Sequence, residues 1–325
     1  MSLFSDFSIV VIGVIAVLIT AHYVVIASIN IAKHFRLSDE FTGMTILAIG
    51  TSLPEIITHI VGSIKIIKHP DSMHNISSLV IGTNVGSDVF QQNFLIGLVA
   101  VFAVLTVKRR HLVKNMGGLI FASVILLVFS FNGIVSRTEG LILCSAYLVY
   151  LYLLHKYDID DDTEQVSSTG NPGLTVNIII LSGGFLIMGF AADKVLDASV
   201  EIVETLNISS SFFGIIVLGI ATALPELMTV LVACLKRKTA ISAGVLIGSN
   251  ITNPMFALGL GAMLSTYTVP GVVIMYDLPV KIFTAILIYI MLRKNETINR
   301  PGGILLIVLY LIYIYLRNVY FPVDY

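Results

Sequence analysis

Long apolar stretches separated by short polar segments run along the chain from end to end. A helix needs about 20 predominantly apolar residues to cross a bilayer. Strands of a membrane barrel would instead alternate apolar and polar residues over about 10 positions, and these stretches do not. The pattern predicts an all-α membrane protein with ten transmembrane helices, at residues 7–31, 41–66, 75–104, 112–133, 137–155, 173–204, 212–235, 240–266, 278–293 and 302–320.

The composition agrees with this interpretation. The 325 residues are 56% hydrophobic and 12% charged, whereas soluble domains are about 25% charged. The longest polar stretch, 156–173, is acidic and is interpreted as a solvated linker rather than a domain. The first apolar run lacks a basic flank and a cleavage site, so we interpret it as a span. Cys144 and Cys234 lie in apolar surroundings and are expected to be small buried hydrophobes.

Basic residues are distributed unevenly between the two predicted sides. One side contains thirteen of them: Lys33, Arg36, Lys108, Arg109, Arg110, Lys114, Lys156, Lys236, Arg237, Lys238, Arg293, Lys294 and Arg300. The other side contains six: Lys65, Lys68, Arg137, Lys194, Lys281 and Arg317. Because cytoplasmic loops are enriched in Lys and Arg, both termini are predicted to lie outside and the acidic linker in the cytoplasm.

Two motifs occur once in each half of the chain. "GTSLPEI" (50–56) matches "ATALPEL" (221–227), and "IGTNVGSDVF" (81–90) matches "VLIGSNITNP" (245–254) at a Gly-Ser pair. Each half has five predicted spans, so the second copy enters the membrane with the opposite orientation. Such inverted repeats are typical of secondary transporters, whose site lies at the repeat interface near the midplane. We predict repeats at 1–155 and 174–325, joined by the linker 156–173, with motifs at 48–94 and 219–260.

The first motif contains a helix breaker and an acid in each copy. Pro54 and Pro225 cannot donate to a carbonyl one turn earlier, and broken backbone survives in a membrane only where it faces protein or a cavity. Glu55 and Glu226 follow these prolines, and an ionised carboxylate at the bilayer centre costs at least about 2.5–3.5 kcal/mol. A bound cation would coordinate the freed carbonyls and neutralise the carboxylates, because carbonyl and carboxylate oxygens are suited to Ca²⁺.

The second motif adds neutral oxygen donors. The pairs Ser87 with Gln91 and Ser249 with Asn253 are spaced four residues apart, so each pair lies on one helical face. Two carboxylates can be balanced by one Ca²⁺, by two protons or by several Na⁺. A site that can bind either Ca²⁺ or other cations in its place has the chemistry of an exchanger.

"AIGTSLPE" followed by "GS" in the next span, repeated once, resembles the alpha-repeat signature of the cation/Ca²⁺ exchanger superfamily, and most of all its microbial Na⁺/Ca²⁺ exchangers. The resemblance implies ten helices in two inverted-topology five-helix repeats, in a prokaryotic plasma membrane. It also implies a central site from spans 2, 3, 7 and 8, with spans 1 and 6 sliding against the other eight.

The resemblance assigns roles to individual positions. Glu55 and Glu226 would be the Ca²⁺ ligands, assisted by the backbone carbonyls of Thr51 and Thr222. The flanking Na⁺ positions would be formed by serines: Ser52, Ser87 and Ser249. The transported ions would be Ca²⁺ and Na⁺, with no cofactor and no nucleic acid, in a membrane of lipids where one chain suffices for transport.

The sequence departs from the family pattern at several positions. Ala223 stands where a serine is common, so one flanking oxygen is missing and the number of Na⁺ sites is left open. Gln91 replaces the usual asparagine. Asn253 stands where K⁺-dependent exchangers have an aspartate, which argues against a K⁺ requirement.

Asp88 and His59 are two further ionisable residues near the motifs. Together they support proton-coupled Ca²⁺ exchange as the alternative function, because histidine changes charge near neutral pH. For His59 we favour a simpler interpretation, a helix-end residue near headgroups or a packing polar group. We expect Asp88 either to hydrogen-bond to a residue that binds the ion or to pair with a buried cation such as Lys194.

Other features are expected to have structural roles. Asp193, Asp197 and Glu201 have four-residue spacing and are interpreted as a wetted helix face rather than a cation-attracting vestibule. An enzyme is the main rival class, because "MYDLP" (275–279) resembles an intramembrane aspartyl-protease motif. The required Gly-X-Gly-Asp and the zinc-protease His-Glu-X-X-His are both absent from the sequence, so we expect no enzyme. A passive channel could also use acidic rings, but inverted broken helices favour alternating access.

Overall fold

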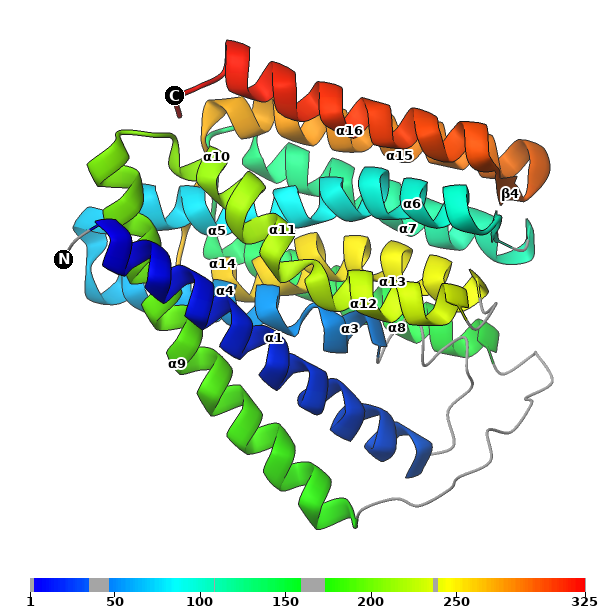
Figure 1. Cartoon of the computed structure of the whole chain (residues 1–325), viewed down its shortest axis with the longest axis horizontal. Helices are drawn as coiled ribbons and strands as arrows, with labels where there is room; N and C mark the ends of the chain where they lie inside the picture. The colour runs from blue at the N-terminus through cyan, green and yellow to red at the C-terminus, as the bar shows by residue number, and fades with distance from the viewer. Residues whose placement is uncertain (1–2, 35–46, 108, 159–172, 236–238, 325) are drawn as a thin grey trace.

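A computed structural model describes residues 3–34, 47–107, 109–158, 173–235 and 239–324 (Figure 1). The first half contains α1 (Leu3–His34), α3 (Ala48–Thr51), α4 (Leu53–Lys68), the 3₁₀ turn η2 (Pro70–Ser72), α5 (Met73–Val89), the π-helical turn η3 (Phe90–Leu95), α6 (Ile96–Phe102), β1 (Leu105–Thr106), α7 (Arg109–Ser130), β2 (Ile134–Val135) and α8 (Arg137–Asp158).

The second half repeats this order. It contains α9 (Leu174–Leu206), α10 (Ser210–Phe213), the π-helical turn η4 (Gly214–Leu218), α11 (Gly219–Thr222), α12 (Leu224–Leu235), α13 (Thr239–Thr252), the π-helical turn η5 (Asn253–Ala257), α14 (Leu258–Leu264), β3 (Tyr267–Thr268), the π-helical turn η6 (Val273–Asp277), α15 (Leu278–Asn295), β4 (Thr297–Ile298) and α16 (Arg300–Tyr320).

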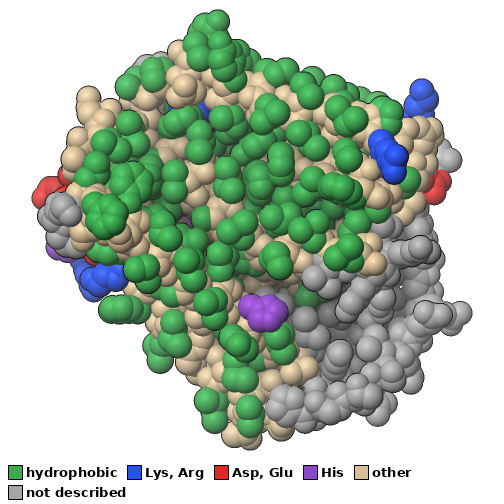
Figure 2. Space-filling view, in the orientation of Figure 1, with side chains coloured by type: hydrophobic (Ala, Val, Ile, Leu, Met, Phe, Trp, Pro, Cys, Tyr) green, Lys and Arg blue, Asp and Glu red, His purple; other side chains and the backbone are tan. Residues whose placement is uncertain are grey.

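The described residues include nine helical segments that are long and apolar enough to cross a membrane. They correspond to nine of the ten predicted spans. The remaining one, predicted at 41–66, is represented by α3 and α4, and its first residues lie outside the described ranges. Hydrophobic side chains cover most of the described surface in Figure 2, and the charged side chains visible there lie mainly toward its left and right margins. The prediction of an all-α membrane protein is confirmed.

The two halves have opposite orientations. In Figure 1, α5 leads into α6 from left to right, whereas α13 leads into α14 from right to left. The contacts between halves are reciprocal, because α6 packs on α16 and α14 packs on α8. The short antiparallel strand pairs follow the same rule, with β1 paired to β4 and β2 paired to β3. The inverted repeat predicted from the motifs is therefore present in the fold.

Helices α1 and α9, the first of each half, form a separate pair. They lie side by side along one edge of the molecule in Figure 1 and make extensive contacts with each other. Glycine allows this close approach, since a Cβ at Gly184 would collide with Val24 and one at Gly13 would collide with Val195. The pair contacts the remaining helices mainly through α4.

Helices α8 and α16 occupy equivalent places and begin with similar caps. Ser136 N–H donates to Glu139 Oε2 at 2.7 Å and Glu139 N–H donates to Ser136 Oγ at 3.4 Å, which is a capping box. At the start of α16, the side chain of Asn299 accepts a hydrogen bond from Gly302 N–H at 3.2 Å. Each cap satisfies backbone donors that the first helical turn leaves without partners.

Glycines bring the two motif-bearing regions into backbone contact. A Cβ at Gly82 or Gly86 of α5 would meet backbone atoms of α10 or η4, and a Cβ at Gly214 or Gly219 would meet the backbone of α5. The spacing is four residues on α5 and five on the other side. The π-helical turn η4 accommodates the longer spacing, because such a turn inserts one residue into a helix. This crossing places Ser87 of α5 beside the start of α11.

Two basic residues assigned to the outer loops are instead inside the protein. Lys281 and Arg317 are both fully buried, so neither belongs in the comparison of loop charges. Without these two, the predicted outer side has four basic residues and the predicted cytoplasmic side has thirteen. The difference between the two sides becomes larger. Cys144 is buried as expected, Cys234 is partly exposed, and both are free thiols.

Arg317 belongs to a polar network that ties the C-terminal tail to the start of α10. Its guanidinium pairs with Asp277 at 3.3 Å and donates to Ser211 Oγ at 2.6 Å. Asp324 accepts hydrogen bonds from Ser209 Oγ at 2.7 Å and from Ser211 N–H at 3.0 Å. A carboxylate at this position stabilises the positive end of the helix.

Asp324→Ala is therefore expected to lower the free energy of unfolding by about 1 kcal/mol, as loss of a helix cap does. The melting temperature of the purified protein in detergent would measure it. Asp71→Ala, at an exposed position of η2, is the control. Equal melting temperatures for the two variants would contradict a stabilising role for Asp324.

Candidate functional site

The helices that carry the first motif are broken at the same place in both halves. Ser52 (φ −79°, ψ 6°) and Ala223 (φ −79°, ψ 0°) are the turn residues that separate the two helical pieces of each half. The second residue of the following helix is Pro54 in α4 and Pro225 in α12, where a missing N–H is tolerated. Each glutamate thus lies in the first turn of a helix, whose N-terminal end favours a negative charge.

Glu55 lies among polar groups from three helices. Its Oε1 accepts a hydrogen bond from Ser87 Oγ at 2.6 Å, and Ser87 in turn accepts one from Gln91 Nε2 at 2.9 Å. Helix α11 packs beside this group, because a Cβ at Gly219 would lie 2.8 Å from the backbone nitrogen of Ser87. The second carboxylate oxygen, Oε2, is buried and has no hydrogen-bond partner.

Glu226 has a corresponding environment with looser contacts. Its Oε1 faces Ser249 Oγ at 3.4 Å and Ser52 Oγ at 3.5 Å. The hydroxyl of Thr51 lies 3.4 Å from that of Ser249. These distances are longer than a good hydroxyl–carboxylate hydrogen bond, and Glu226 Oε2 is also buried without a partner.

The two motifs exchange contacts across the repeat interface. Ser52 of the first half lies 3.5 Å from Glu226, and Thr51 of the first half lies 3.4 Å from Ser249 of the second. A Cβ at Gly219 of the second half would lie 2.8 Å from the backbone nitrogen of Ser87, which donates to Glu55. The two carboxylates therefore belong to one site between the repeats, and both are fully buried. Two like charges without a compensating cation are costly in such a place.

Amide groups complete the polar interior around the carboxylates. Buried amide oxygens on the same helices also have no hydrogen-bond partner, among them Asn84 Oδ1, Asn250 Oδ1 and Asn253 Oδ1. Carboxylate and amide oxygens are hard donors, the type that Ca²⁺ prefers. Sequence reasoning missed Asn84 and Asn250, although both are amides in apolar spans.

Gln91 and Asn253 occupy equivalent positions in the two halves and bond to residues at equivalent positions, but Gln91 accepts its hydrogen bond and Asn253 donates it. Asn250 Nδ2 donates to Gln91 Oε1 at 3.3 Å, and Asn253 Nδ2 donates to Asp88 Oδ1 at 2.8 Å. The bonds leave different atoms free. The amide oxygen of Gln91 is occupied, whereas that of Asn253 is available.

Asp88 is ion-paired with Lys281 and not with Lys194. Lys281 Nζ contacts Asp88 Oδ2, and neither side chain is exposed. Lys194 is half exposed and lies 3.5 Å from Asp193. From the sequence, Lys281 was counted with the basic residues of the outer side, because it lies near the start of the predicted span 278–293. A charge inside an apolar stretch, which is rare and functional by default, was the available signal.

His59 is an interior residue. Its side chain is 1% exposed, with Nδ1 3.3 Å from Tyr267 OH. The tyrosine hydroxyl lies 2.6 Å from Ser63 Oγ and 2.9 Å from the carbonyl oxygen of His59. The interpretation of a helix-end residue near headgroups is wrong, and that of a packing polar group agrees with these contacts.

The acidic residues of α9 are partly wetted, and two of them are ion-paired. Side chains of Asp193 and Asp197 are 39% and 55% exposed, and each has an oxygen 2.6 Å from Lys65 Nζ. Glu201 is exposed. These ion pairs join α9 to α4. The solvent-exposed face of α9 therefore also links helices α1 and α9 to the rest of the protein.

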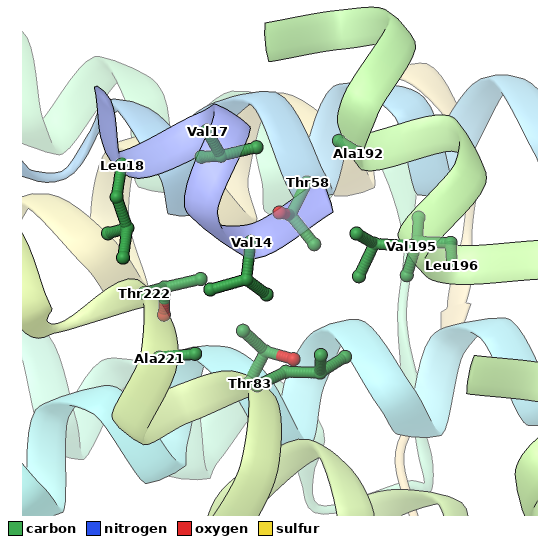
Figure 3. A pocket seen from close by; sticks show the side chains of 11 residues that line it. Val14, Val17, Leu18, Thr58, Thr83, Ala192, Val195, Leu196, Ala221 and Thr222 are labelled. Atoms are coloured by element: carbon green, nitrogen blue, oxygen red, sulfur yellow. The ribbon is translucent and has the colours of Figure 1, made fainter. Parts of the chain in front are cut away.

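A small cavity lies between the α1–α9 pair and the motif helices (Figure 3). Its volume is about 30 Å³, and its walls include Val14 and Leu18 of α1, Val195 of α9, Thr58 of α4 and Thr222 of α11. Because α11 packs against Ser87, the hydrogen-bond partner of Glu55, the cavity adjoins the carboxylate site on the side that faces the α1–α9 pair.

Comparison with known proteins agrees with the geometry. A family model described as sodium/calcium exchanger protein matches residues 5–156 and 176–319. The chain is 25% identical to sodium/calcium exchanger MaX1 of Methanosarcina acetivorans over 95% of this chain and 97% of that protein. It is 26% identical to inner membrane protein YrbG of Escherichia coli, covering 92% of each.

Solved structures of the sodium-calcium exchanger NCX_Mj have the same fold. The structure soaked with 100 mM Na⁺ and 10 mM Sr²⁺ has a TM-score of 0.67 and 26% identity, and the match covers 97% of this chain and 99% of that one. The resemblance predicted from the repeated motif is therefore confirmed. This chain belongs to the sodium/calcium exchanger protein family.

Proposed function

We propose that this chain is a secondary antiporter that exchanges Ca²⁺ for Na⁺ at the site formed by Glu55 and Glu226. The observation that carries the proposal is the pair of buried carboxylates at two helix breaks, each with one oxygen without a partner. One Ca²⁺ would neutralise both charges. The carbonyls of Thr51 and Thr222, at the broken helix ends, would complete its oxygen shell.

Na⁺ as the coupling ion is supported by the hydroxyls around the carboxylates. Ser52, Ser87 and Ser249 each have a side-chain oxygen within 3.5 Å of a glutamate oxygen. A monovalent cation needs several oxygen ligands, whereas a proton on a carboxylate needs none. Gln91 and Asn253 would shape the flanking positions. Ala223 lacks a hydroxyl, so we expect the sites on its side to be weaker.

Alternating access in our proposal comes from movement of α1 and α9 against the other helices. This pair packs on itself through close glycine contacts and borders the cavity beside Thr222. Its link to α4 through Lys65 is made by partly exposed carboxylates. Water reaches the carboxylates of these pairs, although the Lys65 side chain is only 11% exposed, so the pairs can break during a transport cycle.

The orientation that we propose follows from the basic residues. The side richer in Lys and Arg would be cytoplasmic, which puts both termini outside and the linker 156–173 inside. The plasma membrane of a prokaryote is the proposed location. The repeats 1–155 and 174–325 together would form the whole pathway, so that one chain suffices for transport, with no cofactor.

An enzymatic role has less support than transport. An aspartyl protease needs two carboxylates close enough to share a proton. Asp277 of the "MYDLP" segment is paired with Arg317, and Asp88 is paired with Lys281. Each acid is thus bound to its own basic residue.

Proton-coupled Ca²⁺ exchange is the alternative. Four positions motivated it: Gln91, Ala223, His59 and Asp88. The ring of His59 faces Tyr267, and Asp88 bonds to Lys281 and Asn253, so neither hydrogen-bonds to a glutamate. We therefore favour Na⁺.

Uptake of ⁴⁵Ca²⁺ into proteoliposomes distinguishes the two coupling ions. Vesicles loaded with Na⁺ at equal pH on both sides are expected to accumulate Ca²⁺, because outward movement of Na⁺ drives exchange. Vesicles loaded with choline and given only an acidic interior are the matched comparison, with protein-free vesicles as the blank. Uptake that follows the pH gradient and ignores internal Na⁺ would replace our proposal with proton coupling.

A further inference from the structure

Asp88 and Lys281 form an ion pair that is wholly enclosed by the protein. Asp88 follows Ser87 on α5, and Lys281 lies in the first turns of α15. Both side chains are 0% exposed, and Lys281 Nζ contacts Asp88 Oδ2. The other carboxylate oxygen accepts a hydrogen bond from Asn253 Nδ2. The pair is thus one side chain away from the proposed transport site.

The surroundings of Lys281 hold it in place. The amide of Gln92 donates to the backbone carbonyl of Lys281 at 2.8 Å and also to the hydroxyl of Thr284. Thr284 Oγ1 in turn donates to the same carbonyl at 3.2 Å. These bonds fix the backbone of α15 at Lys281. The ammonium group itself is held by its contact with Asp88.

The ion pair joins the two halves of the protein, and its carboxylate has no counterpart in the second half. The position equivalent to Asp88 in the second half is Asn250, whose amide donates to Gln91. Asp88 adjoins the proposed site, because its neighbour Ser87 donates to Glu55 Oε1 at 2.6 Å and its own Oδ1 accepts from Asn253. Three carboxylates and one ammonium leave two negative charges around the site, the number that one Ca²⁺ balances.

We propose that Lys281 acts as a non-exchangeable cation of the transport site, which neutralises Asp88 and so limits the number of monovalent cations exchanged for each Ca²⁺. This inference rests on the proposed Na⁺/Ca²⁺ exchange. Without the ammonium group, Asp88 would be a third uncompensated carboxylate in a closed polar interior, where an unpaired charge is costly. A mobile Na⁺ or K⁺ would then take its place and travel with the cycle. Lys281 is a positioning residue in this role, because it touches Asp88 and not the transported ion.

The first test replaces the ammonium with a neutral group of similar length. Lys281→Gln proteoliposomes are expected to move about one more monovalent cation per Ca²⁺ than wild type, because the exposed charge must be balanced. The ratio of ²²Na⁺ to ⁴⁵Ca²⁺ flux measures this number, and ⁸⁶Rb⁺ flux detects a K⁺-like ion. A wild-type ratio without Rb⁺ movement, in a folded variant, would overturn the proposal.

Two further variants separate charge from packing. Asp88→Asn leaves the ammonium unpaired and is expected to weaken apparent Ca²⁺ affinity by about tenfold or more, through repulsion. Asp88→Asn combined with Lys281→Gln restores neutrality and is expected to restore the wild-type flux ratio, whatever its absolute rate. If Lys281→Gln does not fold, unchanged Ca²⁺ affinity in Asp88→Asn would overturn the proposal.

The outcome for wild type separates this inference from the proposed function. Wild-type vesicles that show no Na⁺-dependent Ca²⁺ uptake would overturn both. Normal wild-type exchange, with a double variant whose flux ratio differs from wild type, would overturn the role of Lys281 alone.

Discussion

Glu55→Gln and Glu226→Gln are each expected to abolish Na⁺-dependent Ca²⁺ uptake. Each substitution keeps the shape of the side chain and removes one of the two charges that a Ca²⁺ would balance. Removing one partner of a buried charge interaction costs about 3–5 kcal/mol, so uptake should fall at least about 100-fold. Both glutamates are fully buried and each has a carboxylate oxygen without a hydrogen-bond partner, so the loss should be similar for both.

The matched control is the same substitution at an exposed position. Glu296 lies at the C-terminal end of α15 and is exposed, so Glu296→Gln should transport at the wild-type rate. Elution from size-exclusion chromatography shows whether each variant is folded. Wild-type uptake by either Glu55→Gln or Glu226→Gln would show that the carboxylates do not form the site.

Gly86→Ala is expected to have the largest effect on stability. A Cβ at Gly86 would meet three backbone atoms of Ile215 in η4, and backbone cannot rotate away as a side chain can. Overpacking of this kind costs about 1–3 kcal/mol, and occasionally more. The crossing also positions Ser87 and α11, so transport by any folded fraction should fall as well. Thermal unfolding in detergent measures the first effect.

Gly117→Ala provides the control for this prediction. Gly117 also lies inside a helix, α7, but a Cβ there would meet nothing within 4 Å. Alanine is favoured over glycine in a helix by about 1 kcal/mol, so this variant should melt at the wild-type temperature or above. The packing argument fails if Gly86→Ala and Gly117→Ala have the same melting temperature.

The sequence predicted the helices and their inverted order well because both depend on local patterns. Apolar length determines where a span can form, and the repeated Pro-Glu motif marks the break in each half. The breaks at Ser52 and Ala223 lie inside the predicted motifs. The prediction that Glu55 and Glu226 are Ca²⁺ ligands stays a prediction that the variants above test.

Partners between distant helices were not predictable from the same patterns. Asp88 was expected to pair with a cation such as Lys194, and its partner is Lys281 on α15. His59 was expected at a helix end or as a packing polar group, and its partner Tyr267, beyond the eighth span, was not predicted. Such contacts depend on helix rotation and tilt, which packing against neighbouring helices determines. The π-helical turn η4 could not be predicted from the sequence either, because tertiary packing determines where such a turn forms.

Equilibrium binding of ⁴⁵Ca²⁺ to the purified protein tests most directly whether one two-carboxylate site serves both ions. We expect one Ca²⁺ per chain, displaced completely by Na⁺ at constant pH, and no binding to the Glu55→Gln/Glu226→Gln double variant. Ca²⁺ that remains bound at saturating Na⁺, or that binds the double variant, would contradict a shared site at these two glutamates.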